Sequence, residues 1–199
     1  MRLNEASTRS TPLFRGALAL LLVLTLATVS CRSKKEAYTP RTPRTTRTTT
    51  TDKGDSNTNE KWKKLDIKLT RDDNKALYGE LKQWLGTPYQ YAASQKGRGT
   101  DCSGMVMEVY KTVYDVKLER NSAKIFEKNC REIGKHRLCE GDLVFFNNGK
   151  SSRITHVGIY LKDGYFVHAS SSRGVIVSHL TENYYTTHFQ CAGRVKHNE

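Results

Sequence analysis

Apolar and polar positions follow three different patterns along this 199-residue chain, and each predicts a different kind of region. Residues 16–30 form an uncharged, apolar run, whereas residues 31–61 carry almost no large apolar side chain. In residues 62–199 apolar positions return, first at helical spacing and then in short alternating segments. This last region is long enough for one compact domain and too short for two.

Two helices are predicted at the start of the domain. The first has cap residues at 72–74, an apolar stripe at helical spacing and a stop at Gly86. The second begins at Cys102, because Asp101 is a natural N-cap and apolar residues recur at helical spacing over residues 105–113.

The rest of the domain is predicted to form strands. Its short apolar segments are bounded by turn residues, a pattern typical of β-structure. The expected strands lie at residues 143–146, 154–161, 165–170, 175–178 and 190–195. Helices followed by strands predict an α+β domain.

Residues 1–30 predict a signal peptide. Three arginines precede the apolar run, and the run is shorter than the ~20 residues that cross a bilayer. The small residues before Cys31 resemble a bacterial lipobox, in which the cysteine is lipidated and becomes the mature N-terminus. Thr28 departs from the usual leucine of that motif, so a cleaved signal peptide with an incidental Cys31 is the alternative.

Residues 31–61 predict a disordered, lipid-anchored linker, because so few apolar residues cannot offset the entropy lost on ordering. Much of the formal net charge of +13 lies in this segment and at its junction. Anionic envelope polymers or lipid head groups are the expected partners of this charge rather than nucleic acid, with simple solvation of a linker as the alternative. Arg32 after Cys31 favours an outer-membrane lipoprotein of the bacterial cell envelope, and we expect the domain on the periplasmic side.

A register argument places two histidines side by side. His156 and Gly158 share one face of their predicted strand, and His168 lies in the next strand. A three-residue hairpin loop at 162–164 puts Gly158 opposite His168, which leaves His156 and His168 diagonally adjacent on one face. A two-residue turn would instead put the two rings on opposite faces.

A cysteine at a helix start with two nearby histidines is typical of a cysteine hydrolase. The helix N-terminus and an imidazolium are expected to lower the pKa of Cys102. His156 would take the thiol proton and return it to the leaving amine, while His168 would hold the other ring nitrogen of His156. The Cys102 N–H and the Tyr89 hydroxyl are candidate donors to the tetrahedral intermediate.

Together these residues resemble the NlpC/P60 cell-wall peptidases, a family of compact papain-like enzymes. His168 stands where the family has its third polar catalytic residue. The segments that carry the resemblance are residues 86–89, 101–104, 118–122, 141–146 and 156–160.

The resemblance implies a papain-like α+β fold in which N-terminal helices pack on an antiparallel β-sheet. It implies hydrolysis of peptidoglycan stem peptides through a thioester, typically at the bond between γ-linked D-glutamate and a diamino acid. We expect a monomer that uses no cofactor or metal. The residues that it places at the site are the catalytic Cys102, His156 and His168 and the substrate-facing Tyr89, Asp101, Ser103 and Ser122. Asp101 and Ser103 would include the substrate amino group among their partners.

Two departures from the family pattern affect the loop that shapes the pocket. Ala92-Ala93 replaces the usual Gly-Gly, and the stretch from Tyr89 to Cys102 is one residue longer. Substrate preference therefore stays open. A related thiol amidase or acyltransferase and a non-catalytic wall-binding lipoprotein are the alternative functions.

The remaining cysteines, histidines and tyrosines are weaker candidates for a functional role. Cys130, Cys139 and Cys191 allow three disulfide pairings in an oxidising compartment, and Cys130 with Cys139 closes the shortest loop. The other histidines form no ordered cluster with cysteines, so no zinc site is predicted. The pair Tyr184-Tyr185 is expected in the core or in a lid rather than in a platform for nucleic acid bases.

Overall fold

The computed structural model describes residues 62–196, so the predicted signal peptide, Cys31 and the linker lie outside the described residues. Within residues 62–196, no helix is long and apolar enough to span a membrane. The helices come first in this range and most of the strands follow, which confirms the α+β class.

Helix α2 (Lys75–Trp84) begins at the predicted cap segment. The Asn74 side chain accepts a hydrogen bond from the Leu77 N–H at 3.1 Å. At the other end of the helix, the Trp84 indole donates to the Glu80 carboxylate at 2.8 Å. Gly86 follows with a φ of +86°, in the left-handed region that favours glycine, so the predicted stop is confirmed.

Helix α3 (Cys102–Tyr114) confirms the second prediction. Asp101 caps its first turn by accepting a hydrogen bond from the Gly104 N–H at 2.8 Å. Asp115 ends the helix with a left-handed φ of 55°. The cap places Cys102 at the first helical residue, where the first backbone N–H groups have no carbonyl partner within the helix.

Six strands form one antiparallel sheet in the order β3-β8-β4-β5-β6-β7. All five predicted strands are present, and β3 is an addition to them. The strands are β3 (Cys130–Ile133), β4 (Leu143–Phe146), β5 (His156–Tyr160), β6 (Tyr165–Ser170), β7 (Gly174–His179) and β8 (Phe189–Val195).

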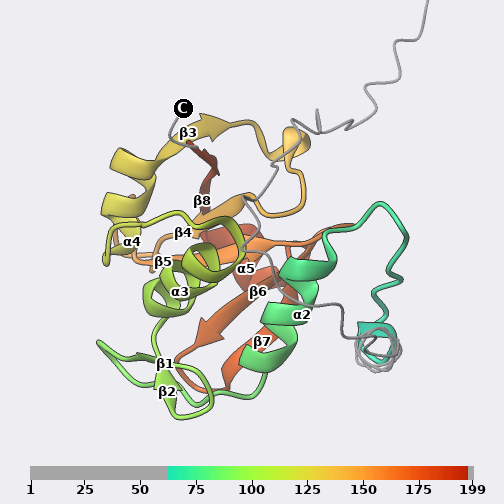
Figure 1. Ribbon diagram of the computed structural model, residues 1–199. Coiled ribbons are helices and arrows are strands. Elements are labelled where there is room, and N and C mark those ends of the chain that lie inside the picture. The colour runs from blue at the N-terminus through green and yellow to red at the C-terminus, as the bar shows by residue number, and fades with distance from the viewer. Residues whose placement is uncertain (1–61, 197–199) are drawn as a thin grey trace, which may run out of the picture. The chain divides into compact units, whose positions relative to one another are not determined.

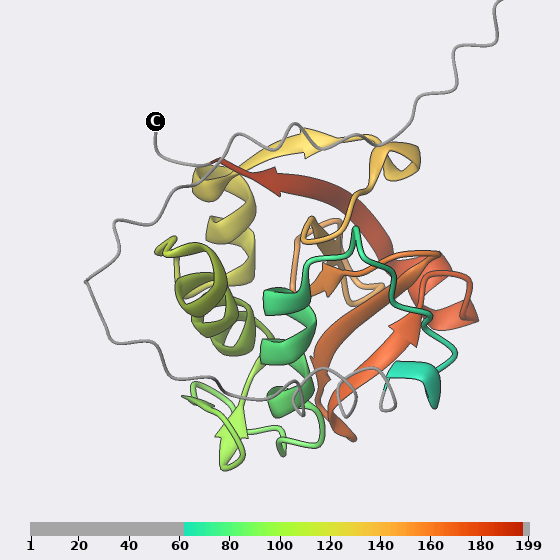
Figure 2. The same cartoon turned by 45° about the vertical axis from the view of Figure 1, so that its right-hand side comes forward.

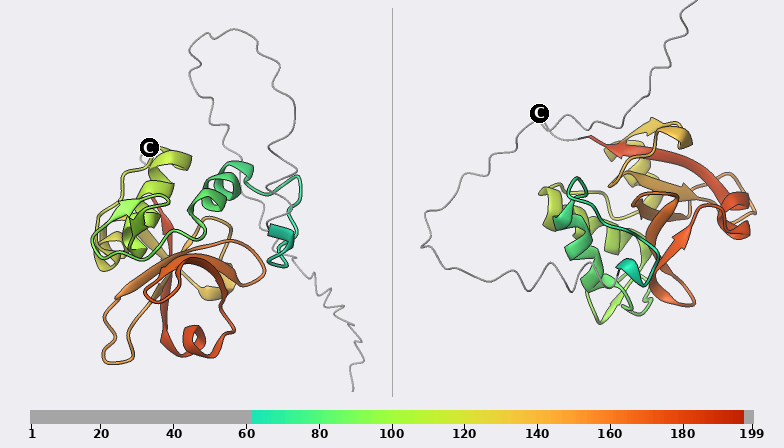
Figure 3. Two further views of the ribbon diagram at one scale, coloured as in Figure 1. Left: turned by 90° about the horizontal axis from the view of Figure 1, so that it is seen from below. Right: turned by 90° about the vertical axis from the view of Figure 1, so that its right-hand side faces the viewer.

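The sheet separates two hydrophobic cores. On one face, α3 packs against β5, β6 and α2, as Figures 1 and 2 show. This larger core includes Trp84, Met105 and Val157. On the other face, the short helix α5 (Asn183–His188) covers a smaller aromatic core that contains Phe146 and Phe166. In the left view of Figure 3, α5 and the helices α2 and α3 lie on opposite sides of the strands.

The hairpin of β5 and β6 has the predicted three-residue loop. Ile159 pairs with Val167 and Tyr160 with Phe166, a register that puts Gly158 opposite His168. A Cβ atom on Gly158 would lie 3.2 Å from the Cβ of His168, so the glycine allows the close approach of the two strands. The prediction that His156 and His168 share a face is therefore confirmed.

Several short elements were not predicted. Their sequences are too short or too polar for a clear period; β3, for example, buries Cys130 but exposes Arg131 and Glu132. These elements are β1 (Ser94–Gln95), β2 (Gly99–Thr100), α4 (Ser122–Lys124), the π-helical η1 (Ile125–Asn129), β3, the 3-10 helix η2 (Lys135–Arg137) and α5.

The favoured disulfide between Cys130 and Cys139 is wrong. Cys130 is a free thiol, buried at the start of β3, and Cys191 on β8 is also free. The Cys130 side chain packs over Gly193 of the neighbouring strand, where a Cβ would meet the Cys130 Cβ at 2.8 Å. Burial raises the pKa of Cys130 to about 12, which keeps this thiol protonated and inert.

Candidate active site

Cys102 is nearly buried, with 8% of its surface exposed. Burial raises the pKa of the Cys102 thiol, and the Asp101 carboxylate adds to the rise, while the N–H groups of Val157 and Ser103 only partly oppose it. The expected lowering of this pKa is therefore wrong, because desolvation outweighs the helix N-terminus. The Val157 N–H also locates the sulfur beside β5, next to the residue that follows His156.

The two histidines form a direct hydrogen bond. His156 Nε2 and His168 Nδ1 lie 2.9 Å apart, and the ring planes are nearly perpendicular at 87°. His168 is 1% exposed, whereas His156 is partly open to solvent. The contact leaves Nδ1 of His156 as the nitrogen that is free to exchange a proton with a thiol.

Both imidazoles are neutral at pH 7 in this arrangement. Although His156 keeps part of its surface exposed, protein surrounds its ring, and this desolvation lowers the pKa of His156 to about 4. The pKa of His168 is lowered further by burial, by the charge that His156 would carry and by Arg173. The site therefore starts as a neutral thiol beside a neutral base, and no imidazolium is present to activate Cys102 before substrate arrives.

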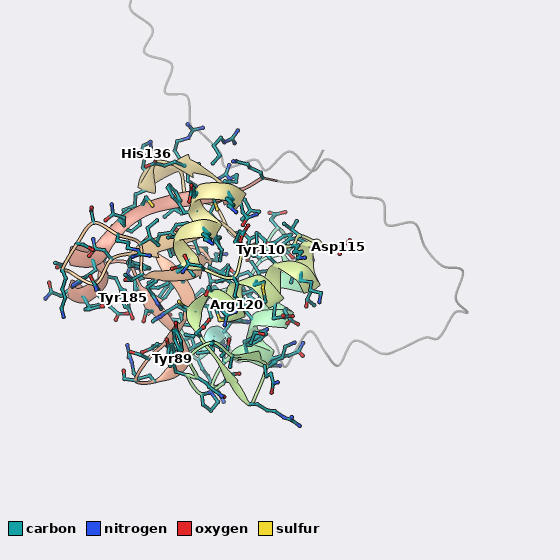
Figure 4. All side chains as sticks on the ribbon, turned by 90° about the vertical axis from the view of Figure 1, so that its left-hand side faces the viewer. Tyr89, Tyr110, Asp115, Arg120, His136 and Tyr185 are labelled. Atoms are coloured by element: carbon teal, nitrogen blue, oxygen red, sulfur yellow. The ribbon has the colours of Figure 1, made fainter. Side chains whose placement is uncertain are left out.

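Tyr89 lies near the nucleophile. Burial raises the pKa of the Tyr89 hydroxyl, and the charges of Cys102 and Asp101 contribute to the rise, so the phenol keeps its proton and can donate a hydrogen bond. The loop from Gly86 to Tyr89 is attached to the edge strand β7, because the Gly86 N–H donates to the Val175 carbonyl at 2.9 Å. In Figure 4 Tyr89 and Arg120 come from separate segments of the chain.

Asp101 binds the protein itself with both carboxylate oxygens. Oδ1 accepts from the Gly104 N–H and Oδ2 accepts from the Ala92 N–H, each at 2.8 Å. The Arg120 guanidinium donates to both oxygens, also at 2.8 Å. Although burial raises it, the pKa of Asp101 is held below its usual value by Arg120 and these N–H groups. A substrate amine would have to compete with these donors, so the predicted amine contact stays a prediction.

Arg120 is the residue of this cluster that sequence reasoning missed. Besides Asp101, it donates to the Ser103 hydroxyl at 2.8 Å and to the Ala93 carbonyl at 3.1 Å. It therefore joins the segment before α4, the start of α3 and the loop that carries Ala92-Ala93. The Arg-x-Ser pattern at residues 120–122 was the available signal, but only its serine was assigned a role.

The two predicted serines are both 6% exposed. The Ser103 hydroxyl also donates to Asp101 Oδ1 at 3.3 Å, so it belongs to the Arg120 cluster. Ser122 is the first residue of α4, whose N-cap is Asn121, and α4 lies against β5. The structure thus brings Tyr89, Asp101 and Ser103 around Cys102 and leaves Ser122 beside the strand of His156. Within residues 62–196, no group of three or more His, Cys, Asp or Glu side chains is arranged to hold a metal ion.

Comparisons with known proteins indicate one family for this chain. A family model described as "NlpC/P60 family" matches residues 86–194. The chain is 39% identical to "Probable endopeptidase NlpC" of Escherichia coli K12 over 119 residues, which are 60% of this chain and 76% of that protein. It is 35% identical to "Murein DD-endopeptidase MepS/Murein LD-carboxypeptidase" of the same strain over 119 residues, or 60% of this chain and 61% of that protein.

A solved structure with the same fold is that of an NlpC/P60 family protein from Bacillus cereus ATCC 10987. The two share a TM-score of 0.55 and 31% sequence identity. The match covers 61% of this chain and 40% of the other.

Proposed function

Because this chain belongs to the NlpC/P60 family, we propose that it is a cysteine endopeptidase that hydrolyses the stem peptides of peptidoglycan. Cys102 is the nucleophile, His156 the general base and acid, and His168 the residue that orients His156. The observation that supports this assignment best is the 2.9 Å contact between the two histidines. His156 lies on β5, the strand whose Val157 N–H faces the Cys102 sulfur.

Acylation begins from the neutral pair. The Cys102 sulfur attacks the carbonyl carbon of the scissile amide while its proton passes to Nδ1 of His156. The Cys102 N–H and the Tyr89 hydroxyl donate to the oxygen that becomes negative. The C–N bond then breaks, the leaving amine takes the proton from His156, and a thioester remains on Cys102.

Deacylation returns the protein to its first state. His156 removes a proton from a water molecule, which attacks the thioester carbonyl carbon. The C–S bond breaks, the carboxyl product leaves, and the proton returns from His156 to the Cys102 sulfur. Proton transfer that is coupled to attack suits a thiol with a raised pKa, because no free thiolate has to be maintained in the buried site.

The bond that we propose is the one between γ-linked D-glutamate and a diamino acid, as the sequence resemblance implies. The cross-link between two stem peptides is the second candidate, because the MepS relative is named a DD-endopeptidase. Both are amides that the same acylation chemistry cleaves. The contacts of Tyr89, Ser103 and Ser122 with substrate belong to this proposal.

The proposal extends to the cellular setting. Residues 1–30 direct export, Cys31 carries a lipid anchor in the outer membrane, and residues 31–61 tether the domain to it on the periplasmic side. The basic composition of the linker supports this assignment, since envelope polymers and lipid head groups are anionic. Labelling cells with a fatty acid tests the anchor: wild type should become labelled and Cys31→Ser should not.

Digestion of purified peptidoglycan tests the activity. Wild type should release peptide fragments that mass spectrometry identifies, and Cys102→Ala should release none. Cys191→Ala is the matched control, because this free thiol lies on β8, which β4 separates from the strand of His156, and its loss should leave the fragments unchanged. Equal fragment patterns from wild type and Cys102→Ala would exclude the thiol mechanism. A new free carboxyl group on D-alanine, instead of on the γ-carbon of D-glutamate, would favour the second bond.

A further inference from the structure

His168 is enclosed by two hydroxyl groups that lie outside the proposed triad. His168 Nε2 lies 2.9 Å from Tyr185 Oη on α5 and 3.3 Å from Ser178 Oγ on β7. All three residues are between 1% and 5% exposed. A buried ring nitrogen needs a hydrogen-bond partner, and these two oxygens supply it.

The proton positions in this chain of groups determine whether His156 can act as a base. A neutral imidazole carries one proton. If His156 holds its proton on Nε2 and donates to His168 Nδ1, its own Nδ1 is free to accept the thiol proton. If His168 donates from Nδ1 instead, His156 must carry its proton on Nδ1 and cannot accept another from Cys102.

The first arrangement places the proton of His168 on Nε2, where it points at Tyr185 and Ser178. The thiolate–imidazolium state requires this arrangement as well, because a doubly protonated His156 can only donate to His168. We therefore propose that Tyr185 is a positioning residue: its hydroxyl oxygen accepts the Nε2 proton of His168 and so keeps His156 in the basic tautomer. This inference rests on the catalytic roles proposed above.

Tyr185 is better placed for this role than Ser178. Its oxygen is nearer to His168 Nε2, 2.9 Å against 3.3 Å, and the Ser178 oxygen lies 3.4 Å from that same oxygen. The charged groups that face the Tyr185 hydroxyl are Arg173, which also hydrogen-bonds it, and Glu182. The Arg173 cation disfavours a positive charge on His168, so the ring stays neutral and carries a single proton.

The ring of Tyr185 is held independently of its hydroxyl. It packs edge-to-face with Phe166 at a centroid distance of 4.9 Å and against Phe146 at 5.3 Å. Tyr185→Phe therefore removes the hydrogen bond and keeps the aromatic packing. The matched control is Tyr184→Phe, which removes a hydroxyl from the neighbouring residue of α5, where the side chain is 56% exposed.

The first measurement is the rate at which iodoacetamide alkylates Cys102, followed by mass spectrometry of the Cys102 peptide between pH 4 and pH 9. Tyr185→Phe should slow alkylation at pH 7 about threefold to tenfold, the range expected from one hydrogen bond. Tyr185→Phe with Ser178→Ala should slow it further, and Tyr184→Phe should match wild type. An unchanged rate in Tyr185→Phe would overturn the proposal, and a faster rate would show that Tyr185 donates to His168.

The second measurement is nitrogen NMR of the histidine rings in the wild-type protein, which reads the tautomers directly. We expect the proton of His168 on Nε2 and that of His156 on Nε2. A proton on Nδ1 of His168 would overturn the proposal, whatever the stability of the variants. Neither measurement uses peptidoglycan, so a wild type that fails to digest the wall would refute the proposed function and leave this test intact.

Discussion

Arg120→Met should destabilise the loop that precedes Cys102 without altering the reacting groups themselves. The guanidinium joins Asp101, Ser103 and the Ala93 carbonyl. Methionine keeps much of the aliphatic stem and removes the charge and the donors. Asp101 would then retain its backbone donors but lose its counter-ion.

The expected destabilisation can be bounded. Breaking a fully buried ion pair costs about 3–5 kcal/mol, and breaking an exposed pair costs about 0–1 kcal/mol. In this pair the Asp101 side chain is 9% exposed and the Arg120 side chain 40% exposed, so we expect about 2 kcal/mol. For a domain of this size, that loss lowers the melting temperature by about 8 °C.

The effect should depend on pH in a known direction. The pKa of Asp101 is lowered in the folded protein, so the pair contributes its full stability above the unfolded carboxyl pKa of about 4. This contribution is lost as the pH falls through the lower folded value. The difference between wild type and Arg120→Met should therefore be full at pH 7 and should shrink below about pH 4.

Thermal unfolding followed by circular dichroism measures both effects. Arg131→Met is the matched control, because this arginine is exposed on β3 and its loss should change the melting temperature little. Asp101→Asn, alone and with Arg120→Met, completes a double-mutant cycle that isolates the pair. A loss below 2 °C at pH 7, or an equal loss at pH 7 and pH 3, would refute the role assigned to Arg120.

Three further predictions follow from the same site. Gly158→Ala should lower stability by about 1–3 kcal/mol and reduce peptidase activity, because the new Cβ would lie 2.9 Å from the Val167 carbonyl and 3.2 Å from the His168 Cβ; a fully active, equally stable variant would contradict this. Peptidase activity should fall on the acid side near pH 4 and not near pH 6.5, since the pKa of His156 is lowered to about 4 and only the neutral ring accepts a proton; a half-maximum near pH 6.5 would contradict it. Iodoacetamide should abolish activity and EDTA should leave it unchanged, because the proposed nucleophile is a thiol; loss of activity in EDTA would count against that assignment.

Features governed by local rules could be predicted from the sequence. The cap of α3 at Asp101 depends on residues within one turn, and the hairpin register depends on the three residues between β5 and β6. The shared face of His156 and His168 followed from that register, once the three-residue loop required by the catalytic hypothesis was chosen over a two-residue turn. These predictions needed no knowledge of how helices and sheet pack together.

Features governed by the packing of distant segments could not be predicted from the sequence. Arg120 reaches Asp101 and Tyr185 reaches His168 from segments without a clear hydrophobic period. The pKa of Cys102 was predicted in the wrong direction because helix position can be read from sequence, whereas the extent of burial cannot. Long-range assembly therefore supplied the supporting residues and the electrostatics of the site.

The short hairpin between β5 and β6 separates the assembly of the site into two events. Its loop of three residues lets the pair of histidines form from neighbouring chain, whereas Cys102 reaches β5 only when α3 docks on the sheet. A polypeptide that crosses a membrane unfolded thus carries a thiol that is separated from its base. In the proposed export, reactivity would therefore arise at the end of folding, after the chain has left the compartment in which it was made.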